Sequence, residues 1–368
     1  MKTIKLIINT KEQKYPIYIG HKLTSKISKI IKSNSIKFKK CLLIVDKNVP
    51  KNLIFQIKKS LKNKKIYLYT FNASEKNKNQ NTINKIFKIL LNNNFSREDC
   101  LFAIGGGITG DVSGYAASTF KRGLQFINVP TTLLSQIDSS IGGKTGINTS
   151  HGKNLIGSFY QPKLVISDIN FLKTLNKREI ISGYGEILKH AIIANIKFCK
   201  YLNKNFSSII ELKSPFIEKS IFESCKIKKI VVEKDEKETG LRKILNFGHT
   251  FAHAFEASLG YSKKLNHGEA VILGIKTALR FSYNYKILNL KDFNFLENHI
   301  KKSGLPSNLK KYFSLKDLNK ILSFMLIDKK NNSKKINLIL LKKIGKPIID
   351  KKYKKNILSF FLKNELMN

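Results

Sequence analysis

The sequence predicts an α/β domain with a Rossmann-like parallel sheet, followed by a mostly α-helical domain. Short apolar runs alternate with helical patterns through the first half of the chain. From about Lys177 onward, the apolar residues recur mostly at three- and four-residue spacing, which is typical of helices. Repetition of strand, helix and strand favours a parallel sheet with helices on its faces. We therefore predict a domain boundary near residue 175, with domains at 1–175 and 176–368.

The individual elements follow from the same patterns. Strands are expected at residues 41–45, 66–69, 101–104 and 126–129, where apolar runs are short. A helix is expected at residues 80–91, which carry apolar side chains at helical spacing. In the second half we expect helices at 181–198, 217–234, 247–259 and 268–285, and a late strand at 336–341.

The composition is that of a globular protein, because 42% of the 368 residues are hydrophobic. The formal net charge of +43 has two interpretations, a nucleic-acid binder or a surface that is rich in lysine throughout. Residues 101–160 favour the second interpretation, because they hold only four basic and two acidic side chains and 11 of the 21 glycines. One stretch thus escapes the general enrichment in lysine, which indicates that chemistry fixes its residues. We do not expect nucleic-acid binding.

The four cysteines are widely spaced and form no C-x-x-C pair. Such cysteines are typical of reduced thiols in a cytosolic protein. The first residues lack the long apolar stretch of a signal peptide, and no apolar run approaches the ~20 residues that span a bilayer. We expect a cytoplasmic protein with no membrane segment.

The first motif is the glycine-rich run Gly105-Gly106-Gly107-Ile108-Thr109-Gly110-Asp111, directly after the predicted strand at 101–104. A strand that runs into glycines and then a helix brings backbone N–H groups and a helix N-terminus close to a phosphate. The alternative is a tight strand–helix turn without a ligand. A standard dinucleotide fingerprint also has an acid about 20 residues later, and residues 125–130 contain none. A ribose-binding acid is available instead at Asp46, after the strand at 41–45.

The second motif is a dense polar block in a glycine-rich setting, from residue 129 to residue 154. It contains Thr131, Thr132 and Asp138, and two lysines flanked by glycine, Lys144 and Lys153. The alternative is an ordinary polar loop with capping Ser and Thr residues. The two lysines indicate an anionic ligand.

The third motif is a set of metal-ligand candidates. His249 and His253 stand at i and i+4 on one predicted helical face, His267 follows after a break, and Glu186 precedes them in another helix. Two or three His residues with one carboxylate are typical of a catalytic zinc site. The spacing does not decide which residues bind, because His190 competes with Glu186 and His253 with His249. The remaining histidines, His21, His151 and His299, have no such neighbours and are expected in surface or core roles.

Taken in order, these motifs resemble the 3-dehydroquinate synthase family of sugar-phosphate cyclases. The shared pattern is collinear from about residue 15 to residue 345, and its most specific block runs from Val129 to Thr145. It comprises Gly-Gly-Gly-x-x-Gly-Asp, Pro-Thr-Thr-Leu-Leu-Ser-Gln-x-Asp-Ser-Ser-x-Gly-Gly-Lys-Thr, Gly-Lys-Asn, Glu-x-x-Lys, Glu-Thr-Gly-Leu-Arg, Gly-His-Thr-Phe-x-His and His-Gly-Glu-Ala.

The resemblance implies an activity and an assembly. The family converts 3-deoxy-D-arabino-heptulosonate 7-phosphate to 3-dehydroquinate and phosphate, in the shikimate pathway of aromatic amino-acid biosynthesis. The steps implied are transient oxidation by NAD, β-elimination of phosphate, reduction, ring opening and intramolecular aldol closure. A divalent metal, Zn²⁺ or Co²⁺, assists. The reaction is a lyase reaction without net redox change, and the enzyme is expected to be a homodimer.

The resemblance also assigns residues. The metal ligands would be Glu186, His249 and His267, so that His190 and His253 are not ligands. The catalytic set would be Lys153, Lys189, Lys228, Arg242, Asn246 and His253. The substrate would further meet Arg122 of the neighbouring subunit, and Asp138, Lys144, Asn154 and Lys330. NAD would lie against Asp46, Glu75, Lys78, Gly107, Ile108, Thr109, Gly110, Asp111, Thr131, Thr132, Lys144, Lys153, Phe171, Leu172, Lys173 and Thr174.

Two positions depart from the family pattern. Gly185 stands where we expect alanine, directly before Glu186, and a glycine there is expected to loosen the helix slightly. Ser74 stands where we expect glycine, beside Glu75.

Overall fold

The computed structural model describes residues 3–327 and 335–367. By its internal contacts the chain divides into two compact units. The first contains residues 1–180 together with 214–237, and the second contains residues 181–213 and 238–368. The segment 214–237 therefore packs with the first unit, although it lies in the second half of the chain. Among the described residues, no helix is long and apolar enough to cross a membrane.

The first unit is built on a seven-stranded sheet whose strand order is β1-β2-β9-β6-β5-β3-β4. The β1–β2 pair is antiparallel, and the pairs from β2 through β9, β6, β5 and β3 to β4 are parallel. The parallel part confirms the predicted fold class. The strands are β1 Ile4–Asn9, β2 Lys14–Gly20, β3 Lys40–Asp46, β4 Lys65–Phe71, β5 Cys100–Gly105, β6 Gln125–Pro130 and β9 Leu164–Asp168.

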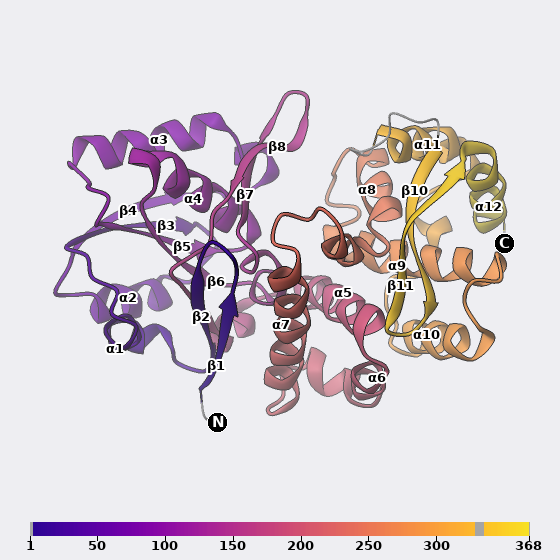
Figure 1. Cartoon of the computed structure of the whole chain (residues 1–368), viewed down its shortest axis with the longest axis horizontal. Helices are drawn as coiled ribbons and strands as arrows, with labels where there is room; N and C mark the ends of the chain where they lie inside the picture. Colours follow the sequence, from indigo (N-terminus) through magenta and orange to yellow (C-terminus); the bar gives the residue numbers. More distant parts are fainter. Residues whose placement is uncertain (1–2, 328–334, 368) are drawn as a thin grey trace. The chain divides into compact units, whose positions relative to one another are not determined.

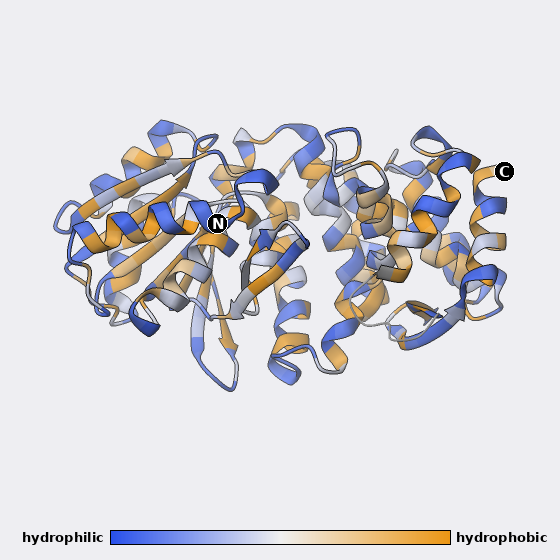
Figure 2. Ribbon diagram, turned by 90° about the horizontal axis from the view of Figure 1, so that it is seen from above, coloured by the Kyte–Doolittle hydropathy of each residue, from blue (hydrophilic) through white to orange (hydrophobic). Residues whose placement is uncertain are grey.

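Helices cover both faces of this sheet, with α1 and α2 on one side and α3 and α4 on the other (Figure 1). Strand β3 shows how the sequence meets both layers: Leu43 packs toward α1 and α2, whereas Leu42 and Ile44 pack toward α3 and α4. Alternate side chains of a strand point to opposite faces, so a strand covered on both sides is apolar throughout. Figure 2 shows this as apolar colour along the strands of the sheet. These helices are α1 Ile27–Ser33, α2 Lys51–Ser60, α3 Gln80–Asn92 and α4 Gly107–Thr119.

Two further elements complete the first unit. A hairpin of β7 Lys144–Thr149 and β8 Gly152–Phe159 forms a separate two-stranded sheet and packs against α4 (Figure 1). Helix α7, Phe216–Lys234, is held by acidic side chains near its ends. Glu218 pairs with His21 at 2.8 Å, and Glu233 accepts a hydrogen bond from the backbone N–H of Asn9 at 2.6 Å. These contacts explain why a segment from the second half of the chain belongs to the first unit.

The second unit is mostly helical, as predicted, with one antiparallel hairpin. Helices α8 and α9 pack closely against each other, and α11 packs on α8. Its elements are the part of α5 Lys177–Ala194 from residue 181 onward, α6 Ile196–Ile210, α8 His249–Ser258, α9 His267–Asn284, α10 Leu290–Lys302, α11 Leu318–Ile327, β10 Lys335–Lys343, β11 Lys346–Lys354 and α12 Lys355–Met367.

One predicted helix is wrong in its extent. The pattern at 181–198 predicted a single helix, but α5 ends at Ala194 and α6 begins at Ile196. Asn195 stands between them, and its side chain accepts hydrogen bonds from the N–H groups of Lys197 at 2.9 Å and Phe198 at 3.4 Å. An asparagine that caps a helix N-terminus in this way starts a new helix.

Candidate functional site

Three candidate metal ligands meet in the second unit. One ligand atom each of Glu186, His249 and His267 lies within 4.8 Å of the others. The Nε2 atoms of His249 and His267 lie 3.3 and 3.8 Å from Oε1 of Glu186. The Glu186 carboxylate is almost completely buried, at 1% exposure. A buried carboxylate that faces two imidazole nitrogens is the donor set expected for a catalytic divalent metal.

The other nitrogen of each imidazole faces an acceptor. Nδ1 of His267 lies 3.0 Å from Oε2 of the buried Glu256, and Nδ1 of His249 lies 3.3 Å from the carbonyl oxygen of Phe247. Acceptors at Nδ1 place the ring proton there and leave Nε2 with its lone pair available for a metal. The structure therefore supplies both the ligands and the groups that orient them.

Close helix contacts hold the three candidate ligands together. Gly268 follows His267 in α9, and a Cβ at position 268 would collide with the backbone of Ser182 in α5. Gly248 precedes His249 at a φ of +81°, where a Cβ would lie 2.7 Å from the backbone nitrogen of Ile275 in α9. Both glycines allow a backbone approach that a side chain would prevent.

Gly185, which replaces the expected alanine, lies in the same region. A Cβ there would lie 2.9 Å from Cγ1 of Ile272 and 3.0 Å from the carbonyl oxygen of Gly268. In this chain the glycine therefore removes a steric conflict between α5 and α9. Gly185 therefore affects the site through the packing of α5 against α9, the helix that carries His267.

Two other predicted catalytic side chains, Lys189 and His253, contact this cluster, and two more, Arg242 and Asn246, lie in the same unit. Lys189 forms an ion pair with Glu186, three residues earlier on α5, and is 2% exposed. The ring of His253 lies 5.3 Å from that of His249 and 6.2 Å from that of His267. Asn246 donates to Oε1 of Glu238 at 2.6 Å, and Arg242 is buried on the same 3₁₀ segment, Leu241–Asn246.

The pKa of His267 is raised to about 8 in the metal-free protein. Burial, the largest influence, lowers this pKa, but the carboxylates of Glu256 and Glu186 raise it further than burial lowers it. Two negative charges beside one imidazole favour its protonated form. The same charges would favour a bound cation.

In the first unit, the predicted cofactor segments gather at one edge of the sheet. Parallel strands end at the same edge, and α/β proteins bind ligands there. Asp46 ends β3, and the Gly107–Asp111 turn follows β5 and opens α4. Thr131 follows β6, and its N–H donates to the carbonyl of Gly105 at 2.9 Å. Phe171, Leu172, Lys173 and Thr174 belong to the 3₁₀ segment Ile169–Thr174 after β9.

These segments differ in exposure and in environment. Phe171 and Leu172 are buried in the core, whereas Lys173 and Thr174 are exposed. The side chains of Thr132 and Ser135 cap each other's backbone N–H groups, both at 3.1 Å. Burial raises the pKa of Asp46 above its ordinary value, against hydrogen bonds that Asn48 donates to it.

A polar network joins the segment after β4 to the β7–β8 hairpin. The buried Lys78 ammonium donates to Oδ2 of Asp111 and to Oδ1 of Asn154, both at 2.5 Å. Lys153 lies 3.3 Å from the carboxylate of Glu75. Five residues predicted for cofactor or substrate thus contact one another.

The pKa values of two acids in this network, Asp111 and Glu75, depart from their ordinary values. Burial raises the pKa of Asp111 above its ordinary value, although Lys78 lowers it. Burial raises the pKa of Glu75 as well, but Lys153 and a hydrogen bond from Asn148 outweigh burial and leave the pKa lowered.

A second ion pair links α7 to the polar block. The ammonium of Lys228 donates to the carbonyl oxygen of Asp138 at 2.6 Å and to its Oδ1 at 2.7 Å. Lys228 is 5% exposed. The insertion of α7 into the first unit is therefore what brings Lys228 to Asp138.

The remaining predicted substrate residues are Lys144, Arg122 and Lys330. Lys144 is exposed at the start of β7. Arg122 is exposed and has a φ of +63°, in a turn directly after α4. Lys330 lies outside the described residues.

Comparison with known proteins decides the family. A model described as 3-dehydroquinate synthase N-terminal matches residues 68–182, and one described as 3-dehydroquinate synthase C-terminal matches residues 183–331. The chain belongs to the 3-dehydroquinate synthase family. The 3-dehydroquinate synthase of Pelagibacter ubique (strain HTCC1062) is 62% identical over 366 residues, which is 100% of both chains. That of Alkaliphilus metalliredigens (strain QYMF) is 42% identical, over 91% of this chain and 92% of its own.

Solved structures share the fold at lower identity. A 2-deoxy-scyllo-inosose synthase complexed with carbaglucose-6-phosphate, NAD⁺ and Co²⁺ has a TM-score of 0.88 at 23% identity, over 98% of this chain and 100% of its own. The 2-epi-5-epi-valiolone synthase from Streptomyces hygroscopicus subsp. jinggangensis 5008, with NAD⁺ and Zn²⁺ bound, has a TM-score of 0.85 at 22% identity, over 97% of this chain and 98% of its own. Both confirm the fold class that the sequence predicted.

Sequence reasoning missed two residues that contact the predicted site residues, Glu256 and Asn148. Glu256 stands seven residues after His249 on α8, a spacing that repeats one helical face and could have indicated it. Asn148 lies in the polar block between Lys144 and Lys153, but its type and position alone gave no signal. Its contacts depend on how β7 meets a segment far away in the sequence.

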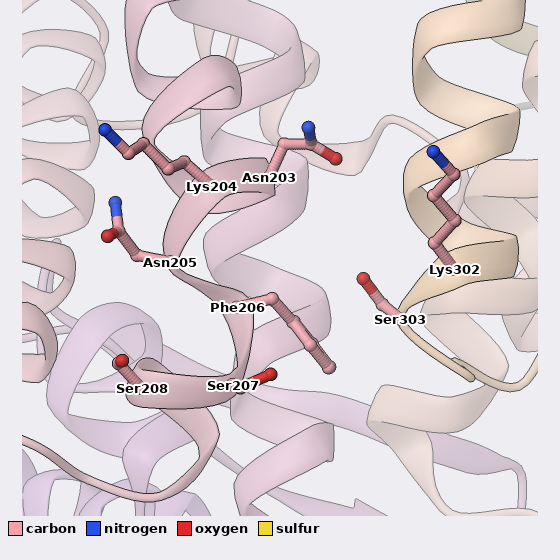
Figure 3. Close-up of a pocket in the computed structure, with 8 residues that line it drawn as sticks. All are labelled: Asn203, Lys204, Asn205, Phe206, Ser207, Ser208, Lys302 and Ser303. Atoms are coloured by element: carbon pink, nitrogen blue, oxygen red, sulfur yellow. The ribbon is translucent and has the colours of Figure 1, made fainter.

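A polar pocket in the second unit is unrelated to the predicted site residues. It has a volume of about 240 Å³ and lies where α6 is kinked at Asn205 (Figure 3). None of the predicted site residues lines it. Its lining residues are Asn203, Lys204, Asn205, Phe206, Ser207, Ser208, Lys302 and Ser303.

Proposed function

We propose that this chain is a 3-dehydroquinate synthase that uses NAD and a divalent metal, Zn²⁺ or Co²⁺. It converts 3-deoxy-D-arabino-heptulosonate 7-phosphate to 3-dehydroquinate and inorganic phosphate, a carbon–oxygen lyase reaction of aromatic amino-acid biosynthesis. The observation that carries the proposal is membership of the family along the chain, together with the Glu186–His249–His267 cluster. The net reaction splits off phosphate and leaves the oxidation level unchanged.

The donor set fits a divalent metal. Glu186, His249 and His267 would hold it, and the carboxylate of Glu256 would keep the His267 ring in the binding tautomer. A bound Zn²⁺ or Co²⁺ supplies Lewis acidity toward a substrate hydroxyl. The relatives of similar fold that carry Co²⁺ or Zn²⁺ support this assignment.

The residues assigned to the cofactor follow the ends of parallel strands, at one edge of the sheet. Asp46, the Gly107–Asp111 turn, Thr131 and Thr132 would hold NAD, with Glu75 and Lys78 beside them. The Phe171–Thr174 stretch would complete the set, with Lys144 and Lys153 reaching both cofactor and substrate. NAD, when bound, supplies a hydride acceptor that is restored within each turnover. The fold relatives that carry NAD⁺ support this assignment.

The chain's own residues would bind and orient the substrate anion. Substrate carboxylate and phosphate need fixed cations, and we assign them Lys144, Lys153, Lys189, Lys228 and Arg242. Lys189 and Lys228 are almost completely buried and held by carboxylates, so their ammonium groups are already in place before substrate binds. Preorganised charge of this kind lowers barriers without reorganisation. Asp138, Asn154, Asn246, His253 and Lys330 would contact the remaining polar groups.

We also propose a two-domain enzyme that works as a homodimer and does not bind nucleic acid. The domains would be a cofactor-binding part at 1–175 and a metal- and substrate-binding part at 176–368. Arg122 would reach the substrate of the neighbouring subunit. Its exposure beside α4 leaves the guanidinium available for such a contact. A bidentate contact of arginine with an anion in a closed site is far stronger than a surface ion pair.

Mixed dimers test the role of Arg122. Subunits carrying Arg122→Ala are combined with subunits carrying Lys153→Ala, each nearly inactive alone. If Arg122 acts across the interface, one site of each mixed dimer carries both changes and the other carries neither, so activity returns toward half. Activity near zero in the mixed dimers would reject the assignment.

The reaction itself is tested by phosphate release. We expect phosphate from the heptulosonate 7-phosphate, in the presence of NAD and Zn²⁺ or Co²⁺, and none from glucose 6-phosphate, which has no carboxylate. Release from glucose 6-phosphate alone would indicate a related sugar-phosphate cyclase instead. Lys228→Met should lower release from the heptulosonate phosphate by at least about 100-fold, since it removes a buried cation.

A further inference from the structure

We propose that Asn148 is a positioning residue that fixes the cofactor segment Glu75–Lys78 and the substrate residues Lys153 and Asn154 in one arrangement. The inference rests on the proposed function of these residues. Asn148 itself belongs to none of the residue sets assigned above.

The regular pairing of the β7–β8 hairpin is interrupted at Asn148. Strands β7 and β8 pair regularly as far as Ile147 opposite Ile156, and pairing resumes at Thr149 opposite Gly152. Asn148 alone therefore stands against the three residues 153–155. Irregularities of this kind re-aim side chains and are common beside active sites. The backbone N–H of Asn148 points elsewhere and donates to the carbonyl of Lys78 at 2.7 Å.

The side chain of Asn148 makes the remaining connections. Its Nδ2 donates to the backbone carbonyl of Glu75 at 3.1 Å and to Oε2 of the same residue at 2.7 Å. Its Oδ1 accepts from the N–H of Asn154 at 3.0 Å. The partners fix the orientation of the amide, because a carboxylate and a carbonyl only accept and a backbone N–H only donates.

The bond to Asn154 fixes an unusual backbone. Asn154 has a φ of +55°, a left-handed conformation that few residues other than glycine adopt. In that conformation its Oδ1 accepts a hydrogen bond from the ammonium of Lys78 at 2.5 Å. Lys153, the preceding residue, lies 3.3 Å from Glu75, whose carboxylate Asn148 also binds. One side chain thus sets the direction of two predicted substrate groups and two predicted cofactor groups.

Two substitutions separate the halves of this role. Asn148→Asp keeps an acceptor for Asn154 but places a carboxylate oxygen against the carbonyl and carboxylate of Glu75, so the bonds to Glu75 are lost and the bond from Asn154 is kept. Asn148→Ala removes both sides. The matched control is Thr149→Ala, because among residues 3–327 and 335–367 the hydroxyl of Thr149 bonds only within the tip of the hairpin, to Gly152 and His151.

Titration of NAD, steady-state kinetics and hydrogen–deuterium exchange of residues 150–156 provide the readouts. For Asn148→Asp we expect the Kd for NAD to rise about tenfold, with the substrate KM within about twofold and exchange unchanged. For Asn148→Ala we expect both constants to rise about tenfold and exchange to speed up. Thr149→Ala should match the wild type in the Kd for NAD and the substrate KM.

Several results would overturn the proposal. An unchanged Kd for NAD and an unchanged substrate KM in Asn148→Ala would do so. If the Tm of that variant also falls, the role of Asn148 is purely structural. Wild-type protein that neither binds NAD nor releases phosphate would instead reject the proposed function. Hydrogen–deuterium exchange of residues 150–156 would still test whether Asn148 holds the hairpin. Unchanged exchange in Asn148→Ala would reject that role, whatever the activity of the protein.

Discussion

Replacing Glu256 by glutamine should weaken metal binding although Glu256 is not a metal ligand. Its buried carboxylate lies 3.0 Å from Nδ1 of His267, on the far side of the ring from the candidate metal position. Glutamine keeps an acceptor at this position but removes the negative charge. Alanine removes both and leaves the ring nitrogen without this partner.

The magnitude follows from the kind of bond. Hydrogen bonds to charged groups contribute about 1.5–3 kcal/mol and neutral ones about 1 kcal/mol, so Glu256→Gln should lose about 1 kcal/mol, or roughly fivefold to tenfold in metal Kd. Glu256→Ala should lose about 100-fold, the upper end for groups that orient metal ligands.

The pH of the assay matters. With a pKa of about 8, His267 is mostly protonated at pH 7 in the metal-free protein, and a metal must displace that proton. Removing the charge of Glu256 lowers this pKa and so weakens the competing proton. The loss of affinity should therefore be smaller at pH 7 than at pH 9, where the ring is already neutral.

The assay is competition for Zn²⁺ with a chelator at both pH values. Glu365→Gln provides a control, because Glu365 is a poorly exposed acid of the same unit that pairs with Arg280. Wild-type affinity of Glu256→Gln at pH 9, or an equal loss in Glu365→Gln, would refute the reasoning.

Three further predictions have defined outcomes. His267→Ala should abolish metal retention, whereas His253→Ala should keep the metal and lose activity; metal analysis of both purified proteins checks this, and metal loss from His253→Ala would reject the ligand set. Burial lowers the pKa of His299 to about 4, so the unfolded chain takes up the proton first as pH falls from 6.5 toward 4, and stability is lost in that window. Urea unfolding should show about 2 kcal/mol lost between pH 7 and pH 5 through this residue, a loss that His299→Gln removes; an equal loss in the variant contradicts the assignment. Gly268→Ala should push α9 away from Ser182, lower the free energy of unfolding by about 3 kcal/mol and lose metal binding. An unchanged Tm and an unchanged metal content would contradict the packing argument.

The fold was predictable where a local pattern carries it. The strands β3, β5 and β6 are buried on both faces, so their sequences are apolar runs bounded by turns. The β7–β8 hairpin was not predicted, because Lys144–Thr149 and Gly152–Phe159 are rich in glycine and polar residues and show no apolar alternation. Its strands lie where they do because α4 offers a surface for them, which no local pattern records.

The candidate site was likewise predictable from local patterns in part, and in part depends on contacts between residues that are distant in sequence. Spacing on one helix proposed His249 and His253 as alternatives, and the resemblance favoured His249. What neither could supply is the approach of α5, α8 and α9, because Gly248 and Gly268 act through contacts with residues that are distant in sequence. Glu256 and Asn148 acquire their roles only from such contacts.

The stoichiometry of NADH and phosphate tests the central claim most directly. Substrate, a trace of NAD and the metal-loaded protein are mixed, and absorbance of NADH is followed together with phosphate. We predict many phosphates released for each NAD present, with no accumulation of NADH, because the hydride returns within each turnover. Steady accumulation of NADH that matches phosphate would contradict the account and indicate a metal-dependent dehydrogenase.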